Sequence, residues 1–291
     1  MMKNSIPRKF ILSRWLYIAV ILPCLLLAGD KLTVAIDVGH TKARFGAVSS
    51  RGVTEYDFNH AIASVFLEKI ANTKNIDAFI VNPSGGKITL KRRTEIAAQK
   101  KADLFISLHH DSVQQKYISY WKYHRKKNHY SDKFSGYSIF VSNKNKQALK
   151  SYRFATLLGE QLKSAGFVPT LHHAEEIKGE NRKLLDSTNG IYEFNDLVVL
   201  KTAAMPAVLL ECGVIVNRKE ELLLGSSGFR KEMADAILGA ILEYSTRATE
   251  ESRQRAGADT ISGPTSHGST KETKEKQDSA SSSPSSIKTT K

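Results

Sequence analysis

The 291-residue sequence contains only two cysteines, Cys24 and Cys212. Cys24 lies in an N-terminal segment that we expect to be removed, which leaves Cys212 as the only thiol of the mature chain. An intrachain disulfide is then excluded, and stability has to come from the apolar core. A folded region of about 215 residues is large enough to bury most of its unfolded surface. We expect Cys212 to pack in this core as a small hydrophobic residue.

The apolar run at residues 15–29 is short for a membrane span, since it has 15 residues and a bilayer-crossing helix needs about 20. Four lysines or arginines precede it within the first 14 residues. This combination is typical of a secretory signal peptide, so residues 1–29 predict export to the periplasm or cell envelope. Leu26 and Ala28 form a poor cleavage motif before Gly29, and an uncleaved signal anchor is the alternative. Contact with a membrane is expected only through that segment.

Large apolar side chains are scarce in residues 246–291, which are rich in Ser, Thr, Lys and Glu and contain only Ile261 and Ile287 as exceptions. Such a segment cannot bury enough surface to fold, and we expect it to be disordered. No repeated binding module is visible elsewhere. The folded domain is therefore expected to span residues 31–245.

Positive charge is abundant. Of the net charge of +14, +3 falls on residues 1–30 and +2 on residues 246–291, which leaves +9 on residues 31–245. A basic domain favours polyanionic partners. Nucleic acid is one such polyanion, but an exported protein does not meet it, so we expect no nucleic-acid partner.

Buried-strand patterns alternate with amphipathic helix patterns along the domain. Such alternation predicts an α/β fold, a single domain with a mostly parallel central sheet flanked by helices on both faces (phosphorylase/hydrolase-like). The expected strands are residues 32–38, 76–82, 103–108, 137–142 and 206–210, and the expected helices are residues 54–72, 90–101, 147–165 and 228–244.

Four residues with metal-binding or acid/base side chains stand at the ends of these elements. His40 follows VAIDVG, His109 follows DLFISL and Glu211 follows PAVLL, while Glu55 opens a helix after the capping residue Thr54. Ligands of α/β sheets lie at the carboxyl ends of the strands. A catalytic zinc ion needs three protein ligands and an open fourth position. His40, Glu55 and His109 provide such a set, and Glu211 is then available as a general base.

Four sequence blocks carry a resemblance to a known family. VAIDVGHTKARFGA, TEYDFNHAIASVFLEKI, LKRRTEIAAQKKADLFISLHHDS and MPAVLLECGVIVN resemble, in order and spacing, the blocks of the zinc-dependent N-acetylmuramoyl-L-alanine amidases (amidase type 3). The resemblance covers about residues 31–245. It implies hydrolysis of the amide bond between N-acetylmuramic acid and the first L-alanine of the peptidoglycan stem peptide. It also implies one zinc ion on His40, Glu55 and His109, with Glu211 as the catalytic carboxylate.

Other histidines compete for the metal. Neighbouring side chains of a strand point to opposite faces, so His109 and His110 cannot both face one site, and the family pattern selects His109. His172 and His173 form another potential cluster, for which a solvated loop is the favoured interpretation. Some members of the family carry a segment that covers the zinc, and residues 172–196 are a candidate lid in which the metal is met by Glu175, Glu176 or Glu180.

Residues 114–133 interleave aromatic and basic side chains directly after His109. Such a mixture can stack on sugar rings and pair with carboxylates, so Trp121, Tyr123 and Arg125 are candidates for substrate binding. A solvated basic loop with partly buried aromatics is an equally supported alternative.

Three functions remain open at this point. The first is the amidase, with peptidoglycan as substrate and room for an activating protein partner. The second is a zinc peptidase that cuts stem peptides, because the same ligand set serves any amide. The third is a non-catalytic wall-binding or regulatory protein, which is disfavoured because all four chemical positions hold competent residues.

Overall fold

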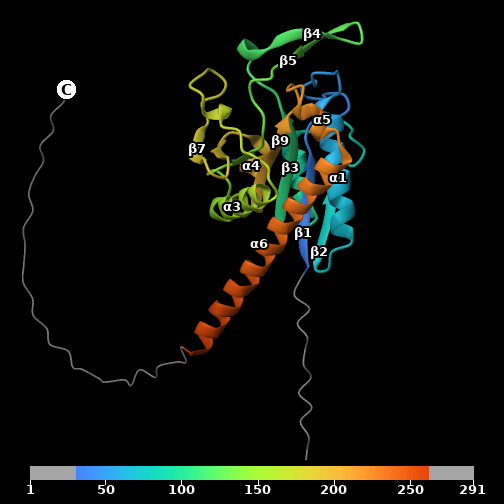
Figure 1. The fold of residues 1–291 in the computed structure, drawn as a ribbon. Coiled ribbons are helices and arrows are strands. Elements are labelled where there is room, and N and C mark those ends of the chain that lie inside the picture. The colour runs from blue at the N-terminus through green and yellow to red at the C-terminus, as the bar shows by residue number, and fades with distance from the viewer. Residues whose placement is uncertain (1–30, 262–291) are drawn as a thin grey trace, which may run out of the picture. The chain divides into compact units, whose positions relative to one another are not determined.

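A seven-stranded sheet forms the centre of the fold in the computed structural model, which describes residues 31–261 (Figure 1). Its strand order is β2-β1-β3-β9-β6-β8-β7. The first four strands in this order are mutually parallel, β6 runs antiparallel to β9, and β7 runs antiparallel to β8. The strands are β1 (Leu32–Val38), β2 (Ile76–Ile80), β3 (Leu104–Asp111), β6 (Ser138–Val141), β7 (Lys183–Asp186), β8 (Ile191–Glu193) and β9 (Ala207–Val214).

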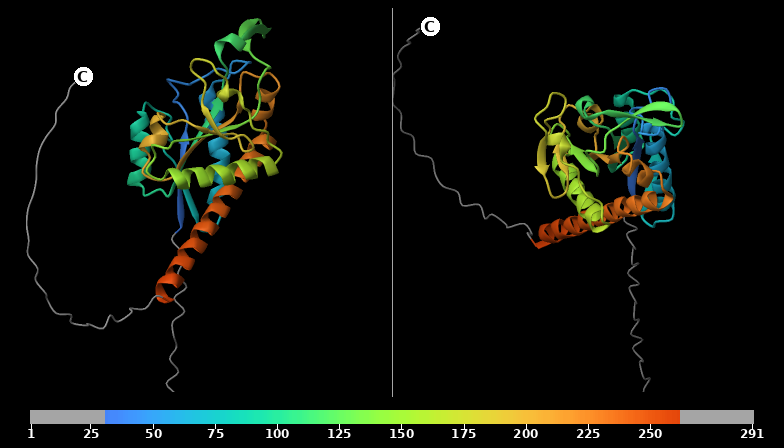
Figure 2. Two further views of the ribbon diagram at one scale, coloured as in Figure 1. Left: turned by 90° about the vertical axis from the view of Figure 1, so that its left-hand side faces the viewer. Right: turned by 45° about the horizontal axis from the view of Figure 1, so that its top comes forward.

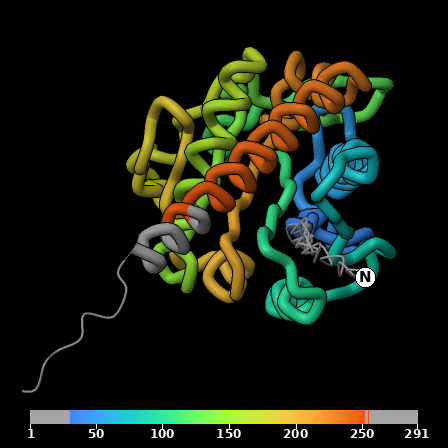
Figure 3. Tube along the Cα trace, turned by 90° about the horizontal axis from the view of Figure 1, so that it is seen from below, coloured from blue at the N-terminus to red at the C-terminus, as the bar shows by residue number. Residues whose placement is uncertain are grey.

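Helices cover both faces of this sheet. On one face, the core unites Ala35, Phe105 and Leu209 of the strands with α2 (Leu90–Gln99) and α4 (Val198–Thr202). On the opposite face lie α1 (Glu55–Ala71), α3 (Ala148–Ser164) and the first part of α6 (Ser227–Ile261). Figure 3 shows the part of α6 before residue 244 between α1 and α3. An ion pair between Lys69 and Asp235 joins α6 to α1. The predicted α/β class with a mostly parallel, two-sided sheet is confirmed.

The sequence pattern of the inner strands explains their position. Residues Val34–Val38 of β1 and Leu104–Leu108 of β3 are buried without interruption, as expected for strands that have helices on both sides. Helix α1 begins after Thr54, whose side chain accepts a hydrogen bond from the Asp57 backbone N–H. Cys212 is buried in β9, as predicted for a small core residue.

Several elements differ from the prediction. Strands β3 and β9 continue to Asp111 and Val214, so His109 and Glu211 lie within strands rather than after them. The short strands β7 and β8 and the helices α4 and α5 (Glu220–Leu224) were not predicted, because three to five residues carry too little periodicity. A hairpin of β4 (Ser119–Tyr123) and β5 (Lys126–Tyr130) forms a separate two-stranded sheet above the main one (Figures 1 and 2).

The C-terminal end of the domain was also predicted differently. Helix α6 continues to Ile261 instead of ending near residue 244, so residues 246–261 of the expected disordered tail are helical. The first compact unit ends at Glu243, and the rest of α6 belongs to a second unit. The expected signal segment 1–29 and residues 262–291 lie outside the described residues. Within residues 31–261, no helix is long and apolar enough to cross a membrane.

Candidate metal centre and active site

His40 lies in a tight turn after β1 and is held there through its backbone. Its φ of 67° is in the left-handed region, which is costly for a residue with a side chain. Arg93 of α2 stabilises this turn, because its guanidinium donates hydrogen bonds to the carbonyl oxygens of His40 and Val38. The same guanidinium is paired with Asp37 Oδ1 at 2.6 Å in a fully buried ion pair. A residue on a distant helix therefore fixes the orientation of His40.

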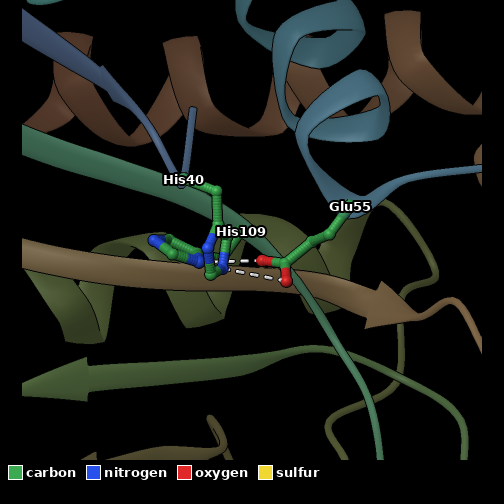
Figure 4. A group of neighbouring side chains, drawn as sticks. All are labelled: His40, Glu55 and His109. Atoms are coloured by element: carbon green, nitrogen blue, oxygen red, sulfur yellow. Dashed lines mark hydrogen bonds and ion pairs between the residues drawn. The ribbon is translucent and has the colours of Figure 1, made fainter. Parts of the chain in front are cut away.

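Glu55 joins the two histidines. Its Oε2 lies 2.9 Å from His40 Nε2, and its Oε1 lies 2.9 Å from His109 Nδ1 (Figure 4). The ligand atoms of the three residues all lie within 4.8 Å of one another. The Ala47 backbone N–H donates to Glu55 Oε2 at 3.0 Å and orients the carboxylate. Two imidazole nitrogens and one carboxylate thus converge from a turn, a helix and a strand, which is the donor set of a zinc or similar divalent cation.

The charge of Glu55 is maintained despite burial. Burial alone would raise the pKa of this carboxyl, but hydrogen bonds and charge interactions with His109 and His40 hold the pKa well below its usual range. An ionised carboxylate between two imidazoles is the state that a cation requires. The donor chemistry of these three residues therefore fits a metal ion.

Two glycines leave room for the ligands. A Cβ on Gly46, which has a φ of 77°, would lie 2.2 Å from Glu55 Oε2 and 2.6 Å from the His40 ring. A Cβ on Gly39 would lie 2.5 Å from the His109 ring. Both positions accept only glycine while the ligands keep their places.

His110 occupies the opposite side of β3 and is linked to Glu55 through Asn59. Its Nδ1 lies 2.7 Å from Asn59 Oδ1, and the Asn59 amide donates to Gly39 O and to Glu55 Oε1. Burial lowers the pKa of His110 to about 3, so this imidazole is neutral. The three residues that come together are thus His40, Glu55 and His109, and His110 stays outside the group.

Glu211 stands beside His109. The two residues are paired across β3 and β9, so their side chains leave the same face of the sheet. Glu211 Oε2 is buried without a hydrogen-bond partner. Burial raises the pKa of Glu211 well above its ordinary value, and the nearby carboxylates of Asp111 and Glu55 raise it further. A carboxyl group with a raised pKa and a free oxygen is suited to accept and return a proton.

A cleft of about 1230 Å³ opens at His40 and His109. Its lining includes three basic side chains that the sequence did not single out, Arg44, Lys87 and Arg92. They were missed because they lie in or next to loops of ordinary composition, and only the fold brings them to His40 and His109.

The proposed substrate-binding residues of the hairpin do not line this cleft. Trp121 donates from Nε1 to the Ser50 carbonyl at 2.9 Å and stacks with Tyr123. The Arg51 guanidinium lies over both rings. Arg125 occupies the hairpin turn with a φ of 65°. Trp121 and Tyr123 therefore anchor the hairpin to the domain, and their contribution to substrate binding stays a prediction.

The glutamates of the expected lid are engaged elsewhere. Both carboxylate oxygens of Glu175 accept the Tyr117 hydroxyl at 2.9 Å, and Glu180 Oε2 lies 2.8 Å from His173 Nδ1. The group around His40 contains neither of them, nor Glu176. The expected contact of one of these carboxylates with the group around His40 is thus absent from this structure, because Glu175 is bound by Tyr117 and Glu180 by His173.

Comparison with known proteins decides the family, because the profile described as N-acetylmuramoyl-L-alanine amidase matches residues 34–243. The chain belongs to this family. The amidase is 28% identical over 240 residues to N-acetylmuramoyl-L-alanine amidase AmiA of Escherichia coli (strain K12). The alignment covers 75% of this chain and 77% of the relative. As a member of the family it is an enzyme, a hydrolase that acts on peptidoglycan.

Solved structures agree with this fold. An N-acetylmuramoyl-L-alanine amidase from Clostridium difficile 630 superposes with a TM-score of 0.59 at 21% identity and covers 75% of this chain and 98% of its own. The CwlD amidase from Clostridioides difficile, solved in complex with the GerS lipoprotein, superposes with a TM-score of 0.55 at 22% identity, with 74% and 98% covered. At these identities the likeness establishes the architecture of the amidase.

Proposed function

We propose that this amidase binds one zinc ion through His40, Glu55 and His109 and uses Glu211 to hydrolyse the bond between N-acetylmuramic acid and L-alanine. The observation that supports this proposal is the convergence of two imidazole nitrogens on the two oxygens of Glu55, with an unpartnered carboxyl oxygen on the adjacent strand. When bound, the ion supplies a Lewis acid that polarises the amide carbonyl and activates a water.

Glu211 performs the proton transfers. Its carboxylate accepts the proton of the attacking water, and the resulting carboxylic acid donates this proton to the alanine nitrogen as the C–N bond breaks. The raised pKa suits this role, because it makes the carboxylate a stronger base toward the water and keeps the proton on the carboxyl until the nitrogen receives it. Asn59 and Arg93 keep the ligands in place during this cycle through Glu55 and His40.

The cleft beside the ligands would receive the stem peptide. Its basic side chains Arg44, Lys87 and Arg92 match the carboxylates of that peptide. Export to the periplasm or envelope follows from the signal-like residues 1–29, and it brings the enzyme to this substrate. An activating protein is a further proposed partner, by analogy with the CwlD amidase that is complexed with the GerS lipoprotein.

Replacing Glu211 with Gln tests the proton-transfer role. We expect Glu211→Gln to keep its zinc and to lose activity on purified peptidoglycan by at least about 100-fold, the usual lower range for general acid–base catalysis. Glu232→Gln, at an exposed site of α6, is the matched control and should retain full activity. Wild-type turnover in Glu211→Gln would rule out the assigned role.

Product analysis separates the amidase from the zinc peptidase. The amidase releases intact stem peptides that begin with a free L-alanine amine, whereas a peptidase shortens the peptide and leaves the lactyl amide intact. Mass spectrometry of digested peptidoglycan distinguishes the two products, and shortened peptides alone would refute the proposed bond.

A further inference from the structure

A second group of potential metal ligands lies outside the proposed zinc site. Asp111 ends β3, and His172 and His173 open the 3-10 turn His172–Ala174 that precedes β7. His172 Nε2 lies 3.0 Å and His173 Nε2 lies 2.9 Å from the same oxygen, Asp111 Oδ2. The ligand atoms of the three residues all lie within 4.8 Å of one another. None of the three belongs to the set formed by His40, Glu55 and His109.

The facing atoms are buried and unsatisfied. Asp111 Oδ2, His172 Nε2 and His173 Nε2 are all closed to solvent, and none of them makes a hydrogen bond of acceptable geometry. Leaving one such atom unpaired in a protein interior costs about 1–3 kcal/mol. Two states satisfy these atoms: protonated histidines that pair with Asp111, or a cation bound between neutral histidines and the carboxylate.

The outer nitrogens show which atoms are free to bind a cation. His173 Nδ1 lies 2.8 Å from Glu180 Oε2, and a carboxylate can only accept, so Nδ1 carries the hydrogen. When Nε2 carries no proton, its lone pair is directed at Asp111 Oδ2, 2.9 Å away, and a cation that takes the place of the Nε2 proton can bind both atoms. Gln114 holds the other oxygen of Glu180 at 2.7 Å.

The second histidine is oriented in a comparable way. His172 Nδ1 lies 2.9 Å from Thr170 Oγ1, which leaves Nε2 directed at Asp111. The other oxygen of Asp111 accepts the Ser112 backbone N–H at 2.7 Å, so Oδ2 is turned to the histidines. A carboxylate or hydroxyl behind each ligating imidazole is the usual support of a metal site.

We propose that Asp111, His172 and His173 bind a second divalent cation of the zinc class. Two imidazoles and one carboxylate suit zinc better than calcium or magnesium, which prefer oxygen ligands. The ion would tie the segment before β7 to the end of β3. This site goes beyond the proposed function, which requires only the first ion.

Metal content of the purified full chain tests the proposal. We expect two zinc equivalents per wild-type chain and one in Asp111→Asn, which removes a charge at constant volume. His40→Ala should also hold one equivalent, and the double variant should hold none. Asp196→Asn, an exposed carboxyl paired with Lys144, is the matched control and should hold two. A single equivalent in the wild type, or two in Asp111→Asn, would overturn the second site.

A titration of the wild-type chain avoids any dependence on how the variants fold. After removal of metal with a chelator, zinc is added while the imidazole NMR signals are recorded. Signals of His172 and His173 should shift during the uptake of one equivalent, and those of His40 and His109 during the other. Unchanged His172 and His173 signals up to two equivalents would refute the proposal. Loss of the His40 response alone would instead contradict the amidase site, so the two failures are distinguishable.

Discussion

Replacing Gly46 with Ala should weaken metal binding about 100-fold without unfolding the domain. The new Cβ would lie 2.2 Å from Glu55 Oε2 and 2.6 Å from the His40 ring. Gly52 provides a matched control, because its φ of 94° is also in the left-handed region but the nearest heavy atom to its Cβ, Asn128 Oδ1, is 3.9 Å away. Gly46→Ala and Gly52→Ala therefore share the backbone strain and differ only in the clash with the ligands.

The size of the effect follows from these distances. The left-handed backbone costs each alanine variant roughly 1–2 kcal/mol of stability. Carbon and oxygen atoms in contact prefer a separation of about 3.5 Å, so Gly46→Ala has to displace two ligands by about 1 Å. A misplacement of this size costs about 100-fold in activity. We expect the zinc Kd of the site formed by His40, Glu55 and His109 to rise about 100-fold in Gly46→Ala and to stay within about threefold of wild type in Gly52→Ala.

Two measurements decide the matter. Competition with a chromophoric chelator gives the zinc Kd of each variant, and urea unfolding gives its stability. We expect both variants to lose similar stability, whereas the zinc Kd of Gly46→Ala should be about 100-fold higher than that of Gly52→Ala. If Gly46→Ala binds zinc as tightly as Gly52→Ala, the steric reasoning about this site is incorrect.

Three further changes test other parts of the structure. Arg93→Met should lower stability by about 3–5 kcal/mol in urea unfolding, because Asp37 would be left as an unpaired buried charge; a loss below 1 kcal/mol would contradict the role of this pair. Lys87→Ala should raise KM several-fold at constant kcat, whereas Lys150→Ala on α3 should change neither; equal kinetics in both would remove Lys87 from the substrate cleft. Burial raises the pKa of Glu220 from 4.5 to about 7, so folding favours its protonated form. The corresponding stability, about 3 kcal/mol, is present below pH 4.5 and is lost as the pH rises through 7. In urea unfolding, the stability of Glu220→Gln should lack this part of the pH dependence. If the wild type and Glu220→Gln show the same dependence of stability on pH, the assigned role of Glu220 is disproved.

Elements with long apolar patterns were predicted well. The inner strands and the helices α1, α2 and α3 appear within a few residues of their expected bounds, because a run buried on both faces or an extended amphipathic stripe is encoded locally. The hairpin β4–β5 was not predicted, because its aromatic residues were attributed to ligand binding. Their partners Ser50 and Arg51 lie about 70 residues away, and no local pattern reveals such contacts.

The sequence by itself determined the α/β class and the course of the inner strands, and it predicted the four chemical residues His40, Glu55, His109 and Glu211. It did so because hydrophobic periodicity and residue type are properties of short segments. Only the tertiary structure decided which atoms meet. It placed the two oxygens of Glu55 on two different histidines, brought Arg93 to the His40 turn, and directed His172 and His173 at Asp111. These contacts join residues that are 15 to 62 positions apart in the sequence. Their distances depend on the packing of helices against the sheet and not on the residues adjacent to them in the sequence.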